Sequence, residues 1–296
     1  MKIFVTGAAG QLGHDVIAVL AQRGHAVIGS DVADTCDTAT YVKLDITDAS
    51  AVEAVLTECA PDAVIHCAAW TAVDLAEEPD LQQKVRAINA DGTRNIARVC
   101  KKLSCKMLYI STDYVFDGQG ETPWDPDCKD YKPLNVYGQT KLDGELAVAE
   151  LVEKFFIVRI AWVFGLNGNN FIKTMLNVGK KYDTLRVVND QVGTPTYTAD
   201  LSYLLADMVE SEKYGYYHAT NEGGYISWYD FACEIFRQAG YPTKVNAVTT
   251  AEYGLSKAAR PFNSRLDKSK LVQAGFRPLP AWQDALQRYL KELEVI

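Results

Sequence analysis

Residues 4–13 read Phe4-Val5-Thr6-Gly7-Ala8-Ala9-Gly10-Gln11-Leu12-Gly13, an apolar run followed by three evenly spaced glycines. The run Lys2–Thr6 predicts a strand, and apolar residues at 12, 16, 19 and 20 predict one face of a helix. Glycines in this setting allow a tight turn, backbone approach to a pyrophosphate and close helix packing, and the helix start attracts the phosphates. We therefore predict a dinucleotide-binding turn made by Gly7, Gly10, Gln11, Leu12 and Gly13, and not a turn that merely joins two elements.

Three later segments extend this prediction. Asp31 ends the second predicted strand, about 20 residues after the turn, where a carboxylate binds the adenosine ribose and repels a 2′-phosphate. This favours NADH over NADPH without excluding either. Asp45 and Ile46 are placed for the adenine, although a solvated turn aspartate explains Asp45 nearly as well. The segment Ala68-Ala69-Trp70-Thr71 follows the fourth strand, and its small alanines allow a cofactor to lie close, although strand packing would also favour them.

Strand-like and helix-like segments alternate over the first two thirds of the chain, which is typical of an α/β protein with a doubly wound parallel sheet of the Rossmann type. Beyond residue 164 the pattern becomes irregular. We predict a dinucleotide-binding domain from 1–163 and 185–220, interleaved with a smaller C-terminal substrate-binding region from 164–184 and 221–296. The predicted strands are Lys2–Thr6, Ala26–Ser30, Tyr41–Leu44, Ala63–Ala68, Lys106–Ser111, Phe155–Ala161 and Leu185–Val188.

Tyr137 and Lys141 stand four residues apart at the start of a predicted helix, so their side chains share one face. A neighbouring ammonium and an oxidised nicotinamide would favour the phenolate and lower the pKa of Tyr137 towards neutrality. Such pairs also occur by chance on solvated helices. The strand end Ser111-Thr112 makes the catalytic interpretation stronger, because a hydroxyl there can donate to a substrate oxygen. Strand alternation turns one of these two side chains to the site, and we expect it to be Thr112.

The composition argues against several classes of binding partner. With 296 residues and a net charge of −8, the chain is large enough for a substantial core and repels polyanions, so nucleic acid is not an expected partner. No apolar run approaches the roughly 20 residues of a membrane span. Seven irregularly spaced cysteines and the absence of a leader pattern favour reduced thiols and the cytoplasm. Four scattered histidines and no C-x-x-C pair give no reason to expect a metal.

The glycine turn, the Ser-Thr strand end and the Tyr-Lys pair together resemble the extended short-chain dehydrogenase/reductases. Within them, Ala68 to Asp74, Ser111 to Asp117, Arg159 to Gly165, Asp190 to Thr196 and Arg260-Pro261 are similar to the dTDP-4-dehydrorhamnose reductase family. The resemblance spans nearly the whole chain. It implies reduction of the 4-keto group of dTDP-4-dehydro-L-rhamnose by NADPH or NADH, a step that supplies surface polysaccharide. Tyr137 would donate the proton beside Lys141, Thr112 would polarise the carbonyl, and Asp113 and Trp162 would contact the sugar nucleotide.

One feature departs from that family. Some members bind a magnesium ion between two subunits through carboxylates, partly after the G-x-P-T motif, whereas here Tyr197-Thr198-Ala199 precede Asp200. Glu292 and Glu294 remain, but without the partner carboxylate after the motif there are too few oxygen ligands for a hard cation. We therefore expect a monomer or weak homodimer without a required metal. Two alternatives stay open: another sugar-nucleotide epimerase or reductase of the same superfamily, and a non-catalytic NADP-binding regulatory subunit. A 4,6-dehydratase is disfavoured because Tyr114, not a glutamate, follows Asp113.

Overall fold

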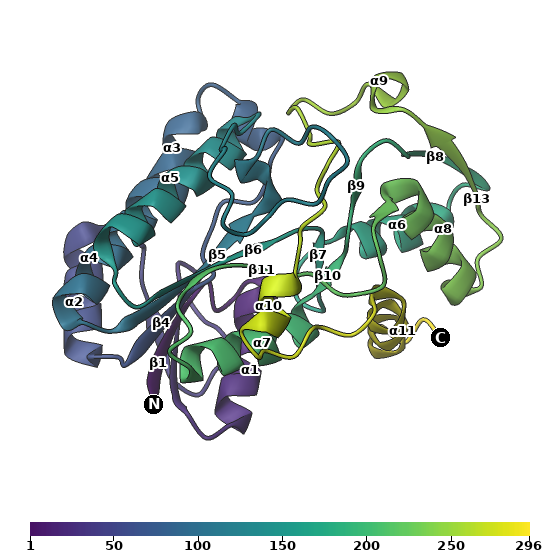
Figure 1. The fold of residues 1–296 in the computed structure, drawn as a ribbon. Helices are drawn as coiled ribbons and strands as arrows, with labels where there is room; N and C mark the ends of the chain where they lie inside the picture. Colours follow the sequence, from purple (N-terminus) through teal and green to yellow (C-terminus); the bar gives the residue numbers. More distant parts are fainter.

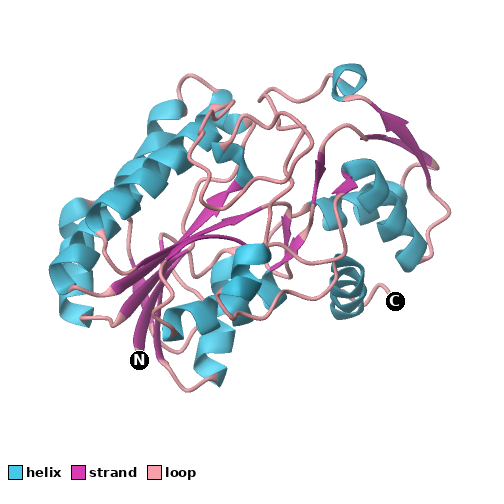
Figure 2. Ribbon diagram, viewed as in Figure 1, coloured by secondary structure: helices cyan, strands magenta, loops and turns pink.

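The computed structural model describes residues 1–296, and a seven-stranded parallel sheet forms its centre (Figures 1 and 2). The strand order β11-β6-β5-β4-β1-β2-β3 reverses beside β1, which is the arrangement of a doubly wound fold. This confirms the predicted fold class. The strands are β1 (Lys2–Thr6), β2 (Ala26–Asp31), β3 (Tyr41–Lys43), β4 (Ala63–His66), β5 (Lys106–Thr112), β6 (Phe155–Ile160) and β11 (Gly215–His218).

Helices cover both faces of this sheet (Figure 1). On one face α1 (Gln11–Gln22) packs against α7 (Thr198–Glu210), and a core that includes Val16 and Leu204 lies beneath them. The other face is covered by α2 (Ala49–Cys59), α4 (Thr93–Leu103) and α5 (Val136–Leu151), over a core that includes Val64. Strands covered on both faces are apolar throughout, which explains the continuous apolar runs in the sequence.

The helical segment over residues 82–103 is long but irregular. It comprises α3 (Gln82–Arg86), the π-helical segment η2 (Ala87–Gly92) and α4 without a break between them. The extra residue of a π turn lets the buried Asn89 side chain bond both Trp70, through its backbone N–H at 2.8 Å, and the hydroxyl of Thr140 at 3.1 Å. This turn therefore ties the segment after β4 to helix α5.

The C-terminal region packs beside one end of the sheet (Figure 1). Its core joins Phe164, Phe231 and Trp282, and none of its sheets has more than two strands. The remaining elements are η1 (Leu75–Glu77), η3 (Asp113–Val115), β7 (Val163–Phe164), α6 (Phe171–Gly179), β8 (Thr184–Val188), β9 (Val192–Gly193), β10 (Thr196–Tyr197), β12 (Ile226–Ser227), α8 (Trp228–Ala239), β13 (Lys244–Val248), α9 (Thr250–Tyr253), α10 (Ser269–Gln273) and α11 (Trp282–Glu292).

The strand predicted at Leu185–Val188 exists, but it does not join the large sheet. It forms β8, which pairs with β13, while the seventh strand of the large sheet is β11. The predicted domain boundary at residue 185 did not anticipate this pairing. The physical reason is that apolar β-branched residues indicate a strand without specifying its partner, and β11 is a four-residue strand that begins at a glycine. The division into domains remains a prediction.

The register of the sheet brings several chain segments to one edge. Thr6 of β1 pairs with His66 of β4, and Thr112 of β5 pairs with Ile160 of β6, so these four strands end close together. Ligands of open parallel sheets bind outside the carboxyl ends of the strands, where the strand order reverses. The glycine turn, the segment after β4, the end of β5 and the end of β6 all meet there.

Candidate active site

The glycine turn requires its glycines for space as well as for backbone conformation. Gly7 has a φ of +71°, and a Cβ there would lie 2.7 Å from the backbone nitrogen of Ala68. A Cβ on Gly13 would overlap the carbonyl oxygen of Gly7. Helix α1 begins at Gln11, its N-cap residue Gly10 has no side chain to cap it, and its first turn contains no acidic residue. Its first N–H groups and positive dipole end are therefore available to an anion, as a pyrophosphate requires.

An adenosine-sized cavity of about 490 Å³ lies beside this turn. The predicted residues Asp31, Asp45 and Ile46 line it, as does Ala68. The Asp31 carboxylate accepts hydrogen bonds from the backbone of Ala9, at 3.1 Å, and of Ala33, at 3.3 Å, which fixes it next to the turn. Residues not singled out from the sequence also line this cavity: Thr47, Lys84, Ala87 and Ile88.

Trp70 is the predicted cofactor residue that lines neither the adenosine-sized cavity nor the adjoining cavity around Tyr137. Its indole donates a hydrogen bond to the carbonyl of Ala72 at 3.1 Å, and the ammonium of Lys84 lies 5.8 Å from its ring. Its neighbours Ala69 and Thr71 do line the cavity around Tyr137. Trp70 is turned away because its backbone is held by Asn89, which orients the segment after β4.

The second cavity, of about 520 Å³, brings the predicted catalytic residues together. Tyr137, Lys141 and Thr112 line it with Asp113 and Trp162, and Gly7, Gly10, Gln11, Leu12 and Gly13 line its other side. Helix α5 presents Tyr137 in its first turn because Asn135 caps the helix, accepting a 2.8 Å bond from the N–H of Gly138. Both cavities fall within the size range of ligand sites.

The protein surroundings of Tyr137 act against the predicted lowering of its pKa. Burial raises the pKa of its phenol well above the usual range, and the hydrogen bond with Thr112 offsets this only in part. The amine of Lys141 donates a 2.7 Å hydrogen bond to the carbonyl of Ile110. The phenol of Tyr137 is therefore neutral at pH 7 in these surroundings.

Lys141 is a buried amine. Its nitrogen lies 4.1 Å from the centre of the Tyr109 ring, and burial lowers its pKa to about 7. The two ionisable side chains that approach from the end of β4 are both neutral at pH 7. Burial lowers the pKa of His66 to about 3 and raises the pKa of Cys67 to about 12. The charge state of Lys141 is therefore sensitive to its remaining neighbours.

Ser111 and Thr112 both line the cavity, so strand alternation does not separate them as expected. The strand ends at Thr112, whose hydroxyl donates to Asp113 at 3.0 Å and accepts from the N–H of Tyr114. The hydroxyl of Ser111 and one carboxylate oxygen of Asp113 are buried without a protein partner. Burial raises the pKa of Asp113 to about 6. Such unpartnered polar atoms in a cavity are suited to a polar ligand.

Trp162 lies at the junction of the two regions. It adopts a left-handed backbone with a φ of +52°, which is unusual for a bulky residue. Its ring stacks on Trp228 with centroids 3.8 Å apart. A Cβ on Gly193 would lie 3.0 Å from the Trp162 ring, so this glycine allows a close approach. Trp228, Phe171 and Phe231 line the cavity as well. No sequence pattern predicted this, because aromatic residues at helical spacing usually indicate a helix core.

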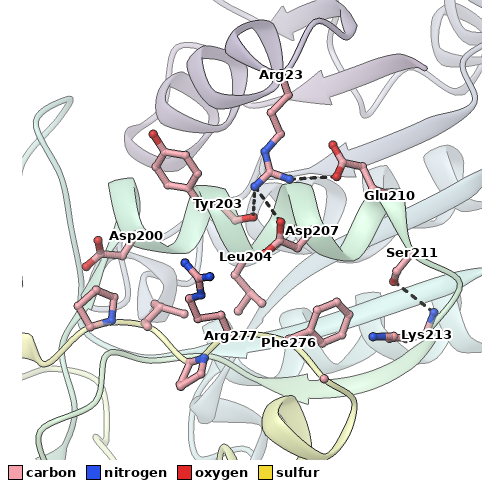
Figure 3. Close-up of a pocket in the computed structure, with 14 residues that line it drawn as sticks. Arg23, Asp200, Tyr203, Leu204, Asp207, Glu210, Ser211, Lys213, Phe276 and Arg277 are labelled. Atoms are coloured by element: carbon pink, nitrogen blue, oxygen red, sulfur yellow. Dashed lines mark hydrogen bonds and ion pairs between the residues drawn. The ribbon is translucent and has the colours of Figure 1, made fainter.

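A larger cavity, of about 680 Å³, lies elsewhere, between α1, α7 and residues 275–280 (Figure 3). None of the predicted site residues lines it. Arg23 is already engaged there by Asp207 at 2.8 Å and by Glu210 at 3.0 Å, and Asp200 is bonded by Arg288 at 2.8 Å. Because these charges are satisfied within the chain, size alone does not make this cavity the functional one.

The carboxylates considered for a metal have other partners. Glu292 accepts a hydrogen bond from the phenol of Tyr197 at 2.5 Å, and Asp200 forms a two-bond ion pair with Arg288. No group of three or more His, Cys, Asp or Glu side chains is arranged to hold a metal ion. No helix of the chain has both the length and the hydropathy of a transmembrane span.

The fold and the site define a dinucleotide-dependent oxidoreductase: a Rossmann sheet, an uncapped helix start beside a glycine turn, and a Tyr-Lys-Thr group in the adjoining cavity. Comparison with known proteins identifies the family. The family model described as the RmlD substrate binding domain matches residues 1–295. The dTDP-4-dehydrorhamnose reductase of Streptomyces griseus is 41% identical over 290 residues, which cover 95% of this chain and 90% of that protein.

Two solved structures agree with this. The crystal structure of a dTDP-4-dehydrorhamnose reductase from Clostridium acetobutylicum has a TM-score of 0.92 and 41% identity, covering 99% of this chain and 100% of that one. The enzyme from Bacillus anthracis, in complex with NADP, has a TM-score of 0.90 and 39% identity, covering 98% and 99%. The chain therefore belongs to the dTDP-4-dehydrorhamnose reductase family. This confirms the predicted resemblance, the oxidoreductase class and the nicotinamide cofactor.

Proposed function

We propose that this chain reduces the 4-keto group of dTDP-4-dehydro-L-rhamnose, forming dTDP-L-rhamnose with NADPH or NADH as reductant. The observation that carries the proposal is the single cavity in which Tyr137, Thr112 and Lys141 face the glycine turn. The names of the relatives agree with this activity. A binding module without catalysis would have no need of a buried phenol, hydroxyl and amine in one cavity, so the regulatory-subunit alternative lacks support.

The residues present fit a nicotinamide dinucleotide. The adenosine half would lie beside Asp31, Asp45 and Ile46, and the pyrophosphate over the uncapped start of α1. The nicotinamide half would then reach the second cavity, near Lys141. An ammonium has three N–H donors, of which the carbonyl of Ile110 takes one, so Lys141 retains donors for ribose hydroxyls.

When bound, the reduced nicotinamide supplies the hydride that the sugar's carbonyl carbon accepts. Tyr137 gives its phenolic proton to the carbonyl oxygen, so the neutral phenol is the required starting state, and the raised pKa of this group maintains it. The Thr112 hydroxyl donates to the same oxygen as negative charge develops there. Lys141, when protonated, stabilises the phenolate that remains after proton transfer.

The substrate's polar groups would meet the cavity wall at Ser111 and Asp113, whose unpartnered oxygens can bond sugar hydroxyls. Trp162 and Trp228 offer a flat aromatic surface to a sugar or thymine ring. We retain NADH as the favoured reductant because the Asp31 carboxylate would repel a 2′-phosphate. A monomer or weak homodimer without a required metal, no nucleic acid or membrane partner, and a cytoplasmic location remain predictions. All seven cysteines are free thiols, which supports the location.

The test incubates the protein with dTDP-4-dehydro-L-rhamnose and either NADH or NADPH, and follows the absorbance of the reduced cofactor. We expect stoichiometric consumption of the cofactor and formation of dTDP-L-rhamnose. Persistent reduced cofactor with this substrate would overturn the proposal. Conversion of the sugar without net cofactor consumption would indicate an epimerase or dehydratase instead.

A further inference from the structure

A fully buried ion pair lies behind the active site. Glu145 of α5 and Arg159 of β6 are joined by two hydrogen bonds of 2.8 Å, and both side chains are 0% exposed. Neither residue lines the catalytic cavity. A buried ion pair gains little net stability over apolar residues of the same size, because both charges must leave water. Its presence therefore calls for an explanation other than stability.

The spacing along α5 gives the first part of an explanation. Tyr137, Lys141 and Glu145 follow one another at intervals of four residues, so they occupy one face of the helix in consecutive turns. Glu145 is the third residue of this row, and it is the one fixed to the sheet through Arg159. The ion pair thus sets the rotation and height of the helix that carries the two catalytic residues.

Arg159 also reaches the loop that follows the catalytic strand. Its guanidinium donates to the carbonyl of Pro126 at 3.1 Å and to the phenol of Tyr131 at 3.0 Å, and it lies 5.0 Å from the centre of the Phe116 ring. In the sheet, Arg159 stands opposite Ser111. The same guanidinium therefore connects α5 with the loop that follows the catalytic strand, while the backbone of Arg159 pairs with the strand end itself.

The charges around Lys141 give the second part of an explanation for the buried ion pair. On its own helix Tyr137 lies one turn before Lys141 and Glu145 one turn after it. His66 and Cys67 approach from β4 and its end, and the ring of Tyr109 approaches from β5. At neutral pH the phenols, the imidazole and the thiol are all uncharged. Glu145 is the charged neighbour, and its negative charge opposes the effect of burial on the Lys141 amine.

We propose that Glu145, anchored by Arg159, is a positioning residue of the reductase: it holds α5 in register with the sheet and keeps the Lys141 amine protonated near neutral pH. This inference rests on the proposed function. It assigns a role to two residues that touch neither substrate nor cofactor. Their effect on catalysis is exerted entirely through Lys141 and Tyr137.

The test is the pH dependence of kcat/KM for Glu145→Gln, an amide of the same shape without the charge. Loss of the negative charge lowers the pKa of Lys141 further, so the ammonium loses its proton at lower pH. We expect the alkaline limb of the profile to move down by about one unit, with NADH affinity falling over the same range. Glu145→Asp, which retains the charge, should return the limb towards that of the unmodified enzyme while kcat stays reduced.

Two further variants keep the test decisive. Glu150→Gln, one turn later on the same helix, removes an exposed partner of Arg94 at 3.1 Å and should leave the profile unchanged. If Glu145→Gln unfolds because Arg159 is left unpaired, the double variant Glu145→Gln with Arg159→Met removes both charges. We expect the double variant to fold and to show a limb displaced in the same direction by a smaller amount, because the Arg159 cation is also gone. A folded variant whose limb does not move would overturn the inference. Inactivity of the unmodified enzyme would instead overturn the proposed function.

Discussion

The two halves of the cleft are built by different means. On the dinucleotide side, backbone groups make the site: Gly7 and Gly13 leave no room for a Cβ, and the start of α1 offers its own N–H groups. On the substrate side, side chains make the site, through the stacked rings of Trp162 and Trp228 and the aromatic core around Phe231. Substitution should therefore affect the first half through steric overlap and the second through loss of ring contact.

Helix α5 joins these halves, and replacing Tyr137 with Phe should have the largest effect of all. The ring and its edge contact with Tyr114, at 5.4 Å between centroids, would remain, but the proton donor would be lost. We expect kcat to fall by about 10²–10⁴-fold with cofactor affinity unchanged, measured by steady-state kinetics and NADH fluorescence titration. Tyr203→Phe, on the exposed side of α7, is the control. Turnover within a factor of ten of normal would show that another group supplies the proton.

Gly13→Ala should disrupt the dinucleotide side of the cleft, which is made by backbone groups, more directly than any other substitution. The added methyl group meets the carbonyl oxygen of Gly7, so the turn must shift. We expect the free energy of unfolding to fall by about 1–3 kcal/mol, and NADH affinity to fall at least tenfold in the fraction that stays folded. At Gly10 the nearest atom to an added Cβ is the carbonyl oxygen of Gly7, 3.1 Å away, so Gly10→Ala should lower the free energy of unfolding less. Thermal unfolding of both variants measures the two losses. Equal losses at both positions would refute the steric account.

Trp228→Ala should disrupt the substrate side of the cleft, because it removes the ring stacked on Trp162. Loss of such a contact is worth about 1.5 kcal/mol or less, so KM for the sugar nucleotide should rise by up to about tenfold. The dissociation constant of NADH should change less than KM for the sugar nucleotide, because Trp228 does not line the adenosine cavity and lines only the second one. Trp228→Phe retains an aromatic ring and should recover most of the affinity. A loss of NADH affinity equal to the loss for the sugar would show that the two halves are not separable in this way.

Asp31→Asn should change cofactor choice rather than stability or catalysis, and it tests the dinucleotide side of the cleft. The amide keeps an oxygen to accept the N–H of Ala9 but no longer repels a 2′-phosphate. We expect the ratio of kcat/KM for NADPH over NADH to rise about tenfold, with stability little changed. Asp34→Asn, an exposed carboxylate paired with Lys43, should leave the ratio as it was. An unaltered ratio for Asp31→Asn would mean that another group selects the cofactor.

The same contrast explains what the sequence could predict. The glycine turn, the positions of the first six strands and the pairing of Tyr137 with Lys141 follow from local patterns, because strand, turn and helix are consecutive in the chain. The partner of β8, the turning away of Trp70 and the arrival of Trp228 in the cavity depend on segments far apart in sequence. The raised pKa of Tyr137 was missed for a similar reason, since burial is a property of the assembled fold.

Transfer of isotope from the cofactor is the most direct test that reductant and keto sugar meet beside Tyr137. The enzyme would be supplied with dTDP-4-dehydro-L-rhamnose and NADH carrying deuterium at C4 of the nicotinamide, prepared separately with each of the two C4 configurations. Mass spectrometry and NMR would then locate the label in the product. We predict a single deuterium at C4 of dTDP-L-rhamnose from one of the two labelled cofactors and none from the other. Product without deuterium from either, or with deuterium at another carbon, would contradict the account.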